Sequence, residues 1–162
     1  MRPDGVTISD LMNQQAQQGR VCWISIRPER RKPPLVLAEI YADASSGLEN
    51  DHYSKEDGKR QVTLINEEHI KAIASFLGKE NLDPGLLRRN IVVKGINLLS
   101  LKNKNFSIGE AVFETSGECH PCSRMEENLG AGGYNAVRGH GGITARIVRS
   151  GLIKLGDQVS ML

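Results

Sequence analysis

The stretch Phe106-Ser-Ile-Gly109-Glu-Ala111-Val-Phe-Glu-Thr115 sets the pattern that recurs along this chain. Two short runs of apolar, β-branched and aromatic residues, which are typical of strands, flank a glycine that suits a turn. We therefore predict two neighbouring strands, residues 106–108 and 111–115, that are joined by a turn at Gly109.

Similar short apolar runs predict further strands over residues 21–26, 35–41, 61–65, 90–94, 145–148 and 152–155. Helical signals are fewer: residues 8–18, and residues 67–77, where Asn66 serves as N-cap and Gly78 ends the helix. Ile70, Ile73 and Leu77 share one face of this second helix. Many short strands with glycine-rich turns and few helices predict a mainly β protein, a β-barrel rather than an alternating parallel sheet.

The composition narrows the class of protein. At 162 residues the chain predicts a single domain, residues 1–162, with 39% hydrophobic residues and a net charge of +2. That charge argues against a nucleic-acid binder, and no run of about eighteen apolar residues predicts a membrane span. The amino terminus lacks the apolar core of a secretory signal, and three cysteines argue against a disulfide framework, so we expect a cytoplasmic protein.

The segment Gly117-Glu-Cys119-His120-Pro121-Cys122-Ser-Arg124 concentrates reactive side chains. Thiolates bind soft metals, and positive charge nearby favours the thiolate over the thiol. Four hypotheses remain: a structural zinc site, a thioredoxin-like redox pair, two cysteines that only fill space, and a single thiolate that binds a soft metal centre. The last is favoured, because zinc needs a second ligand pair and the redox motif needs a βαβ context. Cys22 lies in an apolar strand and is predicted to be an inert buried thiol.

Three further segments suit the binding of an anion. Arg88-Arg89-Asn90 offers guanidinium and amide donors, and Arg138-Gly-His-Gly-Gly142 could expose backbone N–H groups. Asp51 and His52 lie in a long polar loop, and Arg27 begins a basic, proline-rich loop. Solvated surface loops are the alternative explanation for each. A thiolate beside anion-binding groups suggests a phosphorylated metal cofactor.

Taken in order, six segments resemble the MOSC domain, a family named after the C-terminal domain of molybdenum cofactor sulfurases. They are Gly-Leu-Glu-Asn-Asp-His-Tyr, Gln-Val-Thr-Leu-Ile, Leu-Leu-Arg-Arg-Asn-Ile-Val-Val-Lys-Gly-Ile-Asn-Leu, Ile-Gly-Glu-Ala-Val-Phe-Glu, Cys-His-Pro-Cys and Ile-Lys-Leu-Gly-Asp-Gln-Val. The resemblance covers about residues 21–159. It implies a β-barrel similar to the barrel domain of pyruvate kinase, and a molybdopterin-type molybdenum cofactor with a cysteine thiolate that binds the metal or carries sulfur.

The resemblance also implies roles for individual residues. The key cysteine matches Cys122, the expected metal ligand, with Cys119 as its partner in the reactive pair. Arg88 and Asn90 match the Arg-x-Asn element that holds the pterin phosphate in the mitochondrial amidoxime-reducing components. The implied cofactor contacts further include Arg27, His120, and His52, which stands where relatives often have arginine.

The resemblance leaves two functions open. In the first, the protein binds molybdenum cofactor through Cys122 and acts in the reduction of N-hydroxylated compounds, or in cofactor and sulfur handling. In the alternative, it is a non-catalytic delivery module that carries a persulfide on Cys122. We expect no pyridoxal phosphate site, so this chain would not generate a persulfide itself. The expected partners are the small-molecule cofactor and a molybdoenzyme or an electron-transfer protein.

Overall fold

The computed structural model describes residues 5–162. Residues 1–4, on which part of the argument about a secretory signal rests, lie outside the described residues. Over residues 5–162, none of the helices has the length and apolar character needed to cross a membrane.

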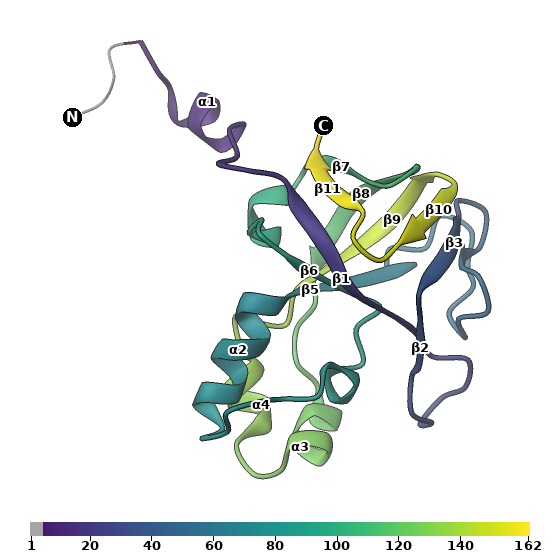
Figure 1. Ribbon diagram of the computed structural model, residues 1–162, viewed down its shortest axis with the longest axis vertical. Coiled ribbons are helices and arrows are strands. Elements are labelled where there is room, and N and C mark those ends of the chain that lie inside the picture. The colour runs from purple at the N-terminus through teal and green to yellow at the C-terminus, as the bar shows by residue number, and fades with distance from the viewer. Residues whose placement is uncertain (1–4) are drawn as a thin grey trace.

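The centre of the molecule is a closed barrel of seven strands, as predicted from the sequence (Figure 1). Around the barrel the order is β11-β7-β8-β9-β5-β6-β1, and pairing of β1 with β11 closes it. Its strands are β1 (Gly19–Ile26), β5 (Val62–Asn66), β6 (Ile91–Lys94), β7 (Asn105–Ile108), β8 (Ala111–Glu118), β9 (Ile143–Arg149) and β11 (Gln158–Met161). A short strand, β2 (Leu35–Leu37), extends the sheet beyond β1.

One pair of barrel strands, β5 and β6, is parallel, and all the other neighbours in the barrel are antiparallel. An odd number of strands cannot close with alternating directions, so a parallel pair is required. Parallel neighbours need a long crossover connection. Here the crossover contains α2 (Glu67–Phe76) and the 3₁₀ turn η1 (Pro84–Leu87), and it delivers the basic segment at residues 88–89 directly before β6.

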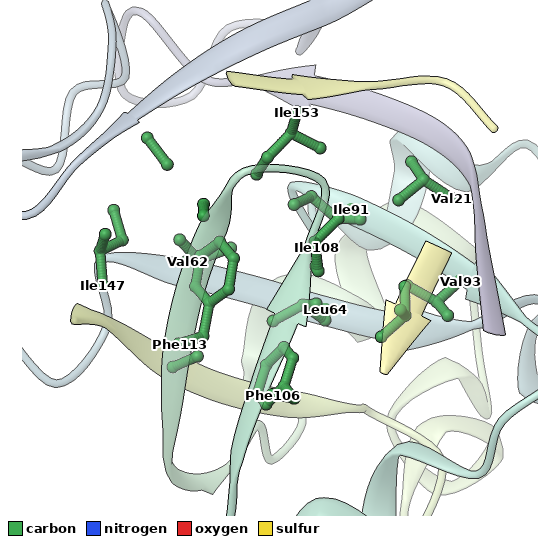
Figure 2. Close-up of a cluster of buried hydrophobic side chains, with 14 of the residues drawn as sticks. Val21, Val62, Leu64, Ile91, Val93, Phe106, Ile108, Phe113, Ile147 and Ile153 are labelled. Atoms are coloured by element: carbon green, nitrogen blue, oxygen red, sulfur yellow. The ribbon is translucent and has the colours of Figure 1, made fainter. Parts of the chain in front are cut away.

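The barrel interior is filled by apolar side chains from every strand of the barrel (Figure 2). The predicted strand-turn-strand segment is confirmed as the β7–β8 pair, in which Ile108 lies opposite Ala111 and Gly109 takes φ 55°. Phe106 and Phe113 stack across this pair with ring centroids 5.4 Å apart. Because few aromatic residues exist, this pair and the branched aliphatic residues around it must supply the core.

The predicted strand over residues 35–41 is in fact two strands in two different sheets. After β2 the chain turns at Ala38, and β3 (Glu39–Asp43) joins a separate small sheet with β4 (Gly47–Leu48) and β10 (Gly151–Lys154). Leu35 and Val36 are exposed. These two residues therefore fit the apolar sequence pattern of a strand, although their side chains do not join the buried core.

The helices α2, α3 (Ser123–Leu129) and α4 (Gly133–Val137) gather at one end of the molecule (Figure 1). Ile70 and Ile73 of α2 are buried in a second apolar cluster there, while Leu77 is only partly buried. Asn66 is the N-cap residue of α2, as predicted, but its side chain makes no cap hydrogen bond to the helix; instead it donates to the Ile96 carbonyl and accepts the Leu98 N–H. That contact fixes the start of η2 (Leu98–Leu101).

The first predicted helix is shorter than expected. α1 (Ile8–Met12) ends after five residues instead of reaching residue 18, and none of its side chains is buried. It stands apart from the barrel in Figure 1. It places no apolar face against the core, and a capping box at Thr7 and Asp10 stabilises it locally.

Candidate functional site

A basic cavity of about 290 Å³ lies beside the cysteine pair. Its walls come from the segment after β1, the turn before β6 and the segment after β8. The lining residues are Arg27, Arg30, Arg31, His52, Arg60, Arg88, Arg89, Cys122, Arg124 and Met125. Seven arginines surround one thiol here, so the cavity suits an anion next to a thiolate. We call it the Cys122 cavity.

Cys122 and Cys119 lie in different environments. Cys122 directly precedes α3, is exposed, and makes no side-chain cap hydrogen bond to that helix, so its thiol is available. Cys119 is 2% exposed and its backbone N–H donates to the Gly142 carbonyl at 2.8 Å. The Cys119 Sγ lies 3.8 Å from an Arg60 Nη atom. The CxxC pair therefore presents one accessible thiol and one buried thiol beside a guanidinium.

Arg27 and His52 are fixed to each other and to Asp51. The Arg27 guanidinium lies 3.5 Å from the Asp51 carboxylate, which also accepts the Arg27 backbone N–H at 2.7 Å. His52 Nδ1 lies 2.8 Å from the Arg27 carbonyl oxygen. A carbonyl only accepts, so Nδ1 donates, and the ring presents Nε2 for other contacts. The long polar loop and the end of β1 are thus held together at the cavity wall.

Arg88 lies at the turn that leads into β6. It takes the left-handed conformation, φ 58°, and one Nη donates to the Lys32 carbonyl at 2.7 Å. Burial lowers the pKa of Arg88, and the neighbouring cations Arg27 and Arg124 lower it further. The group stays charged because arginine titrates so high. Crowded cations of this kind are stabilised when an anion binds among them.

Arg89 has a buried guanidinium with one nitrogen left unpartnered. Its Nε donates to the Gly141 carbonyl and one Nη to the Leu87 carbonyl, both at 2.9 Å, while its Nη2 has no hydrogen-bond partner among residues 5–162. Burial lowers its pKa, and Arg60 adds to that effect. An unsatisfied charged donor costs free energy unless something accepts its hydrogen bond. An acceptor that reaches this nitrogen would therefore stabilise the fold, and Arg89 itself lines the Cys122 cavity.

Asn90, expected from the resemblance to contact the same phosphate, does not line the Cys122 cavity. Its side chain is fully buried, with Oδ1 3.0 Å from both the backbone N and the hydroxyl of Thr63, and Nδ2 3.2 Å from the Ser25 carbonyl. The left-handed turn at Arg88 changes which side chains face the cavity, so Arg89 points there instead. In this structure Asn90 joins β1 to β5 and holds the backbone that carries the two arginines.

His120 lies on a different hollow, of about 130 Å³, together with Cys119 and His69. The predicted anion-binding segment at residues 138–142 also borders this hollow. Two of its glycines, Gly141 and Gly142, are needed for close packing, because a Cβ at Gly141 would overlap the Cys119 carbonyl and one at Gly142 the Leu64 carbonyl. The structure therefore gives these glycines a packing role and separates His120 from the Cys122 cavity.

Over residues 5–162, no cluster of three or more His, Cys, Asp or Glu side chains is placed to hold a metal ion. The structural zinc hypothesis thus finds no ligand set in the described part of the chain. A metal at Cys122 would take a single protein thiolate and receive its other ligands from a cofactor. The orphaned Arg89 nitrogen and the exposed Cys122 thiol fit such a phosphorylated cofactor.

Sequence reasoning did not assign several residues of the Cys122 cavity to the site, among them Arg60 and Arg89. Arg60 comes from the polar loop before β5, and nothing in its local sequence distinguishes it from a solvated residue. Arg89 was grouped with its neighbours, but the phosphate contact was given to Arg88 and Asn90. The turn signal Asp-Pro-Gly at residues 83–85, just before it, could have warned that strand alternation starts only at Ile91.

The three cysteines should differ sharply in reactivity towards iodoacetamide at neutral pH. Cys122 is exposed and near Arg124 in the same cavity, which favours attack, whereas Cys119 is buried. Burial raises the pKa of the Cys22 thiol to about 11, and Glu67 adds to the increase. Competitive alkylation followed by peptide mass spectrometry should label Cys122 first. Earlier labelling of Cys119 would reverse the roles of the pair.

Stability of the protein should fall as the pH drops below about 6.5, the ordinary pKa of histidine. Burial lowers the pKa of His69, and the nearby His140 ring, 5.0 Å away between centroids, lowers it further. Below pH 6.5 the unfolded chain therefore binds a proton at this position that the folded chain refuses, which favours unfolding. Urea midpoints measured between pH 7.5 and 5.5 should show the loss, and His69→Gln should reduce it. The exposed His120→Gln is the control, and an unchanged slope in His69→Gln would contradict the assignment.

Comparisons with known proteins bear on the family and the fold of this chain. The family model of the MOSC domain matches residues 43–160. The fold is similar to the YuaD protein from Bacillus subtilis, with a TM-score of 0.78, 19% identity, and coverage of 90% of this chain and 96% of that one. It is also similar to YiiM from Geobacillus stearothermophilus (TM-score 0.69, 15% identity, 89% and 75% coverage) and YiiM from Escherichia coli (0.67, 16%, 88% and 69%).

A comparison with curated proteins finds no significant match. The structural likenesses, at these identities, show the fold. The family model covers most of the chain, and it includes the segments that build the Cys122 cavity from His52 onward. The family is associated in general with binding of molybdenum cofactor and handling of its sulfur. This chain belongs to the MOSC domain family.

Proposed function

We propose that the Cys122 cavity binds a molybdopterin-type molybdenum cofactor, with the Cys122 thiolate as the protein ligand of molybdenum. The observation that carries this proposal is the combination of an exposed thiol with the unpartnered Nη2 of buried Arg89 in one arginine-lined cavity. A soft thiolate suits a soft metal centre, and guanidinium groups suit the phosphate. When bound, the cofactor would supply a metal that can change its oxidation state.

Within this proposal, the residues in and around the Cys122 cavity have different roles. Arg88 and Arg89 offer charge-assisted hydrogen bonds to a phosphate, and Arg27 and His52 close the wall beside them. Asn90 supports these arginines from the core. Arg60 lies 3.8 Å from the Cys119 Sγ and lines the same cavity as Cys122. Cys119 is a supporting thiol that the fold shields from solvent.

Within this proposal the protein acts in the reduction of N-hydroxylated compounds or in the handling of the cofactor and its sulfur. The exposure of Cys122 supports a second candidate, a delivery module that carries a persulfide on this thiol. A molybdoenzyme or an electron-transfer protein would be the partner, in the cytoplasm.

Analysis of protein purified from a host that makes the cofactor separates the two candidates. Near-stoichiometric molybdenum and released pterin are expected for the cofactor-binding protein. A native mass larger by one sulfur atom on Cys122, without metal or pterin, would favour the delivery module. Each of these two results is compatible with a ligand at Cys122.

Replacing Arg88 should weaken cofactor binding and leave the metal centre unchanged in whatever remains bound. Arg88→Ala removes a charge-assisted hydrogen bond worth about 1.5–3 kcal/mol, so affinity should fall about ten- to a hundredfold. Arg149→Ala is the matched control, since Arg149 is an exposed arginine of β9 that does not line the Cys122 cavity. Equal cofactor retention in the two variants would remove Arg88 from the site.

A further inference from the structure

Two imidazole rings join the segment at residues 138–142 to helix α2. His140, which follows α4, meets the ring of His69 on α2 edge to face, with centroids 5.0 Å apart and ring planes at 90°. It also contacts Phe76 at the end of α2, with centroids 5.5 Å apart. His69 and Phe76 are seven residues apart and therefore share one face of the helix. The His140 ring thus connects its segment to α2 through two ring contacts.

The residues directly after His140 hold two parts of the candidate site. The Gly141 carbonyl accepts a hydrogen bond from Arg89 Nε at 2.9 Å, and the Gly142 carbonyl accepts the Cys119 N–H at 2.8 Å. Arg89 in turn lines the Cys122 cavity. A displacement of His140 would therefore reach a guanidinium of the cavity and the backbone of the cysteine segment within one or two residues.

The two rings are placed for the neutral state. His140 Nδ1 is buried and has no hydrogen-bond partner among residues 5–162. A proton on this atom creates a charged donor with nothing to accept its hydrogen bond, so the ring has to turn towards water. Burial lowers the pKa of His69, and the neighbouring His140 lowers it further. A proton on each ring would place two like charges side by side.

The surrounding groups do not neutralise such a charge. The carboxylate of Glu68 on α2 opposes these two effects on the pKa of His69 only in part, and it already accepts the Gly95 N–H at 2.9 Å. The other titratable groups around the pair, on the segment after β8 and beside His140 in the chain, are Glu118, Cys119, His120 and Arg138. Glu118 is exposed, so water screens its attraction for the rings.

We propose that His69 and His140 form an acid-sensitive latch, which is closed while both rings are neutral and opens when they take up protons. When closed, it positions the carbonyl groups that hold Arg89 and Cys119. When open, it releases both and loosens one wall of the Cys122 cavity. The two histidines are positioning residues, because neither lines that cavity. For its effect on the cofactor the proposal rests on the proposed function, but the latch itself can be measured in cofactor-free protein.

The pH range of the latch follows from its two states. In the open state the rings are solvated and bind protons at the ordinary histidine pKa of about 6.5. The closed state binds fewer protons at the same pH, because the pKa of His69 is lowered by burial and by His140. The open state therefore gains population as the pH falls below about 6.5. For each proton taken up, the gain between pH 7.5 and 5.5 is at most about tenfold.

Amide hydrogen exchange at Cys119 measures the opening, since this N–H donates to the Gly142 carbonyl. In cofactor-free protein, after correction for the intrinsic effect of pH on exchange, its protection should fall about tenfold between pH 7.5 and 5.5. The Ser25 N–H, which donates to the Asn90 carbonyl at 2.7 Å in the barrel, is the reference for unfolding of the whole protein. Cys119 should be less protected than Ser25 at every pH. Equal protection of the two amides, or protection of Cys119 that does not change with pH, would overturn the proposal.

A double variant tests whether the two rings are the titrating groups. His69→Gln with His140→Phe keeps a planar ring against α2 and removes both imidazoles, so the fall in protection at Cys119 should disappear. His120→Gln removes the other histidine of the hollow that His69 lines, and it should keep the fall. An unchanged fall in the double variant, or its loss in His120→Gln, would contradict the assignment.

A titration of the wild-type protein by NMR needs no variant. The ring signals of His69 and the amide signal of Cys119 should change with one common midpoint below the ordinary histidine pKa, because one event moves both. Separate midpoints would mean that the rings take up protons without moving the cysteine segment, and would overturn the latch.

Loaded protein supplies the arm that concerns the cofactor. The rate of release of molybdenum and pterin should rise more from pH 7.5 to 5.5 in the wild type than in the double variant, since protonation of the cofactor's own ligands acts on both proteins alike. An equal rise in the two proteins would overturn the effect on the Cys122 cavity. Protein that never binds molybdenum or pterin would count against the proposed function instead, and amide exchange at Cys119 would still decide on the latch.

Discussion

Gly142→Ala is expected to destabilise the protein by about 2–5 kcal/mol, a large part of the total stability of a domain this size. Gly142 has φ 89°, where a side chain costs roughly 1–2 kcal/mol by itself. Its new Cβ would also overlap the backbone carbonyl of Leu64 in β5. Overpacking against a rigid strand adds about 1–3 kcal/mol, because backbone cannot move aside as a flexible side chain can.

Gly139→Ala is the matched control for this prediction. Gly139 also has positive φ, 78°, in the same loop, but no atom lies within reach of an added Cβ. The two variants therefore share the backbone strain and differ in the overlap. Urea unfolding should show a clearly larger loss for Gly142→Ala. Equal losses would mean that the loop moves freely away from β5 and that the overlap has no consequence.

The same substitution should also disturb the cysteine segment. The Gly142 carbonyl accepts the Cys119 N–H, and the neighbouring Gly141 carbonyl accepts Arg89 Nε. Displacement of this loop by the new methyl group would loosen both anchors. In the fraction of Gly142→Ala that still folds, Cys119 should become accessible to alkylation, which Gly139→Ala should not cause. The loop that sequence analysis assigned to anion binding would then be shown to hold the site in place.

The sequence predicts those helices and strands whose apolar pattern lies within one short segment. The β7–β8 pair follows from apolar runs on either side of Gly109, and α2 follows from the spacing of Ile70 and Ile73. The end of β8 could not be predicted in this way. Residues 116–118 are polar or glycine, and they are extended because Gly117 and Glu118 pair with Thr144 and Ile143 of β9. Pairing between distant segments overrides local propensity there.

The helices after the cysteine pair were missed for a related reason. α3 and α4 are short, Gly130 and Gly132 lie between them and α4 begins with Gly133, so neither shows the periodicity of an independent helix. Their buried residues Met125, Leu129 and Val137 pack on α2 and η1 in the second apolar cluster. Tertiary packing rather than propensity stabilises helices of this length. The sequence thus indicated the reactive cysteines without indicating the helix that Cys122 precedes.

The sequence predicted the kinds of side chain in the candidate site better than it predicted which individual residues line the site. Cys122 and Arg88 could be chosen because thiols and guanidinium groups are conspicuous, and the structure places both on one cavity. The choice between Arg89 and Asn90 depends on the backbone conformation of one residue, Arg88, whose left-handed turn shifts the alternation. Arg60 reaches Cys119 because β9 pairs both with β5, which follows Arg60, and with β8, which precedes the cysteines. Neither the conformation of Arg88 nor the position of Arg60 can be predicted from the neighbouring sequence.

Cys122→Ser is expected to abolish molybdenum loading, to less than about a tenth of the wild-type level, in protein made by a cofactor-competent host. The substitution replaces a soft thiolate by a hard hydroxyl that stays protonated at neutral pH, so the metal loses its protein ligand. The phosphate contacts at Arg88 and Arg89 remain. We therefore expect the variant to retain some weakly bound pterin but no metal. Metal analysis and the fluorescence of released pterin measure the two quantities.

The fold should tolerate this change, so that lost metal cannot be attributed to unfolding. Cys122 is exposed, makes no cap hydrogen bond and occupies the N-cap position of α3. Serine is favoured there over residues that cannot cap, so the melting temperature of cofactor-free protein should stay the same or rise slightly. Cys22→Ser is the matched control: Cys22 is half-buried on β1 away from the cavity, and its variant should keep its molybdenum. Full loading of Cys122→Ser would exclude Cys122 as the ligand, whereas loss of metal from Cys22→Ser at unchanged stability would show that metal loss is not specific to the Cys122 thiol. The delivery module that carries a persulfide on Cys122 would then be the function to test. An exposed thiol among arginines remains a reactive nucleophile even when it binds no metal.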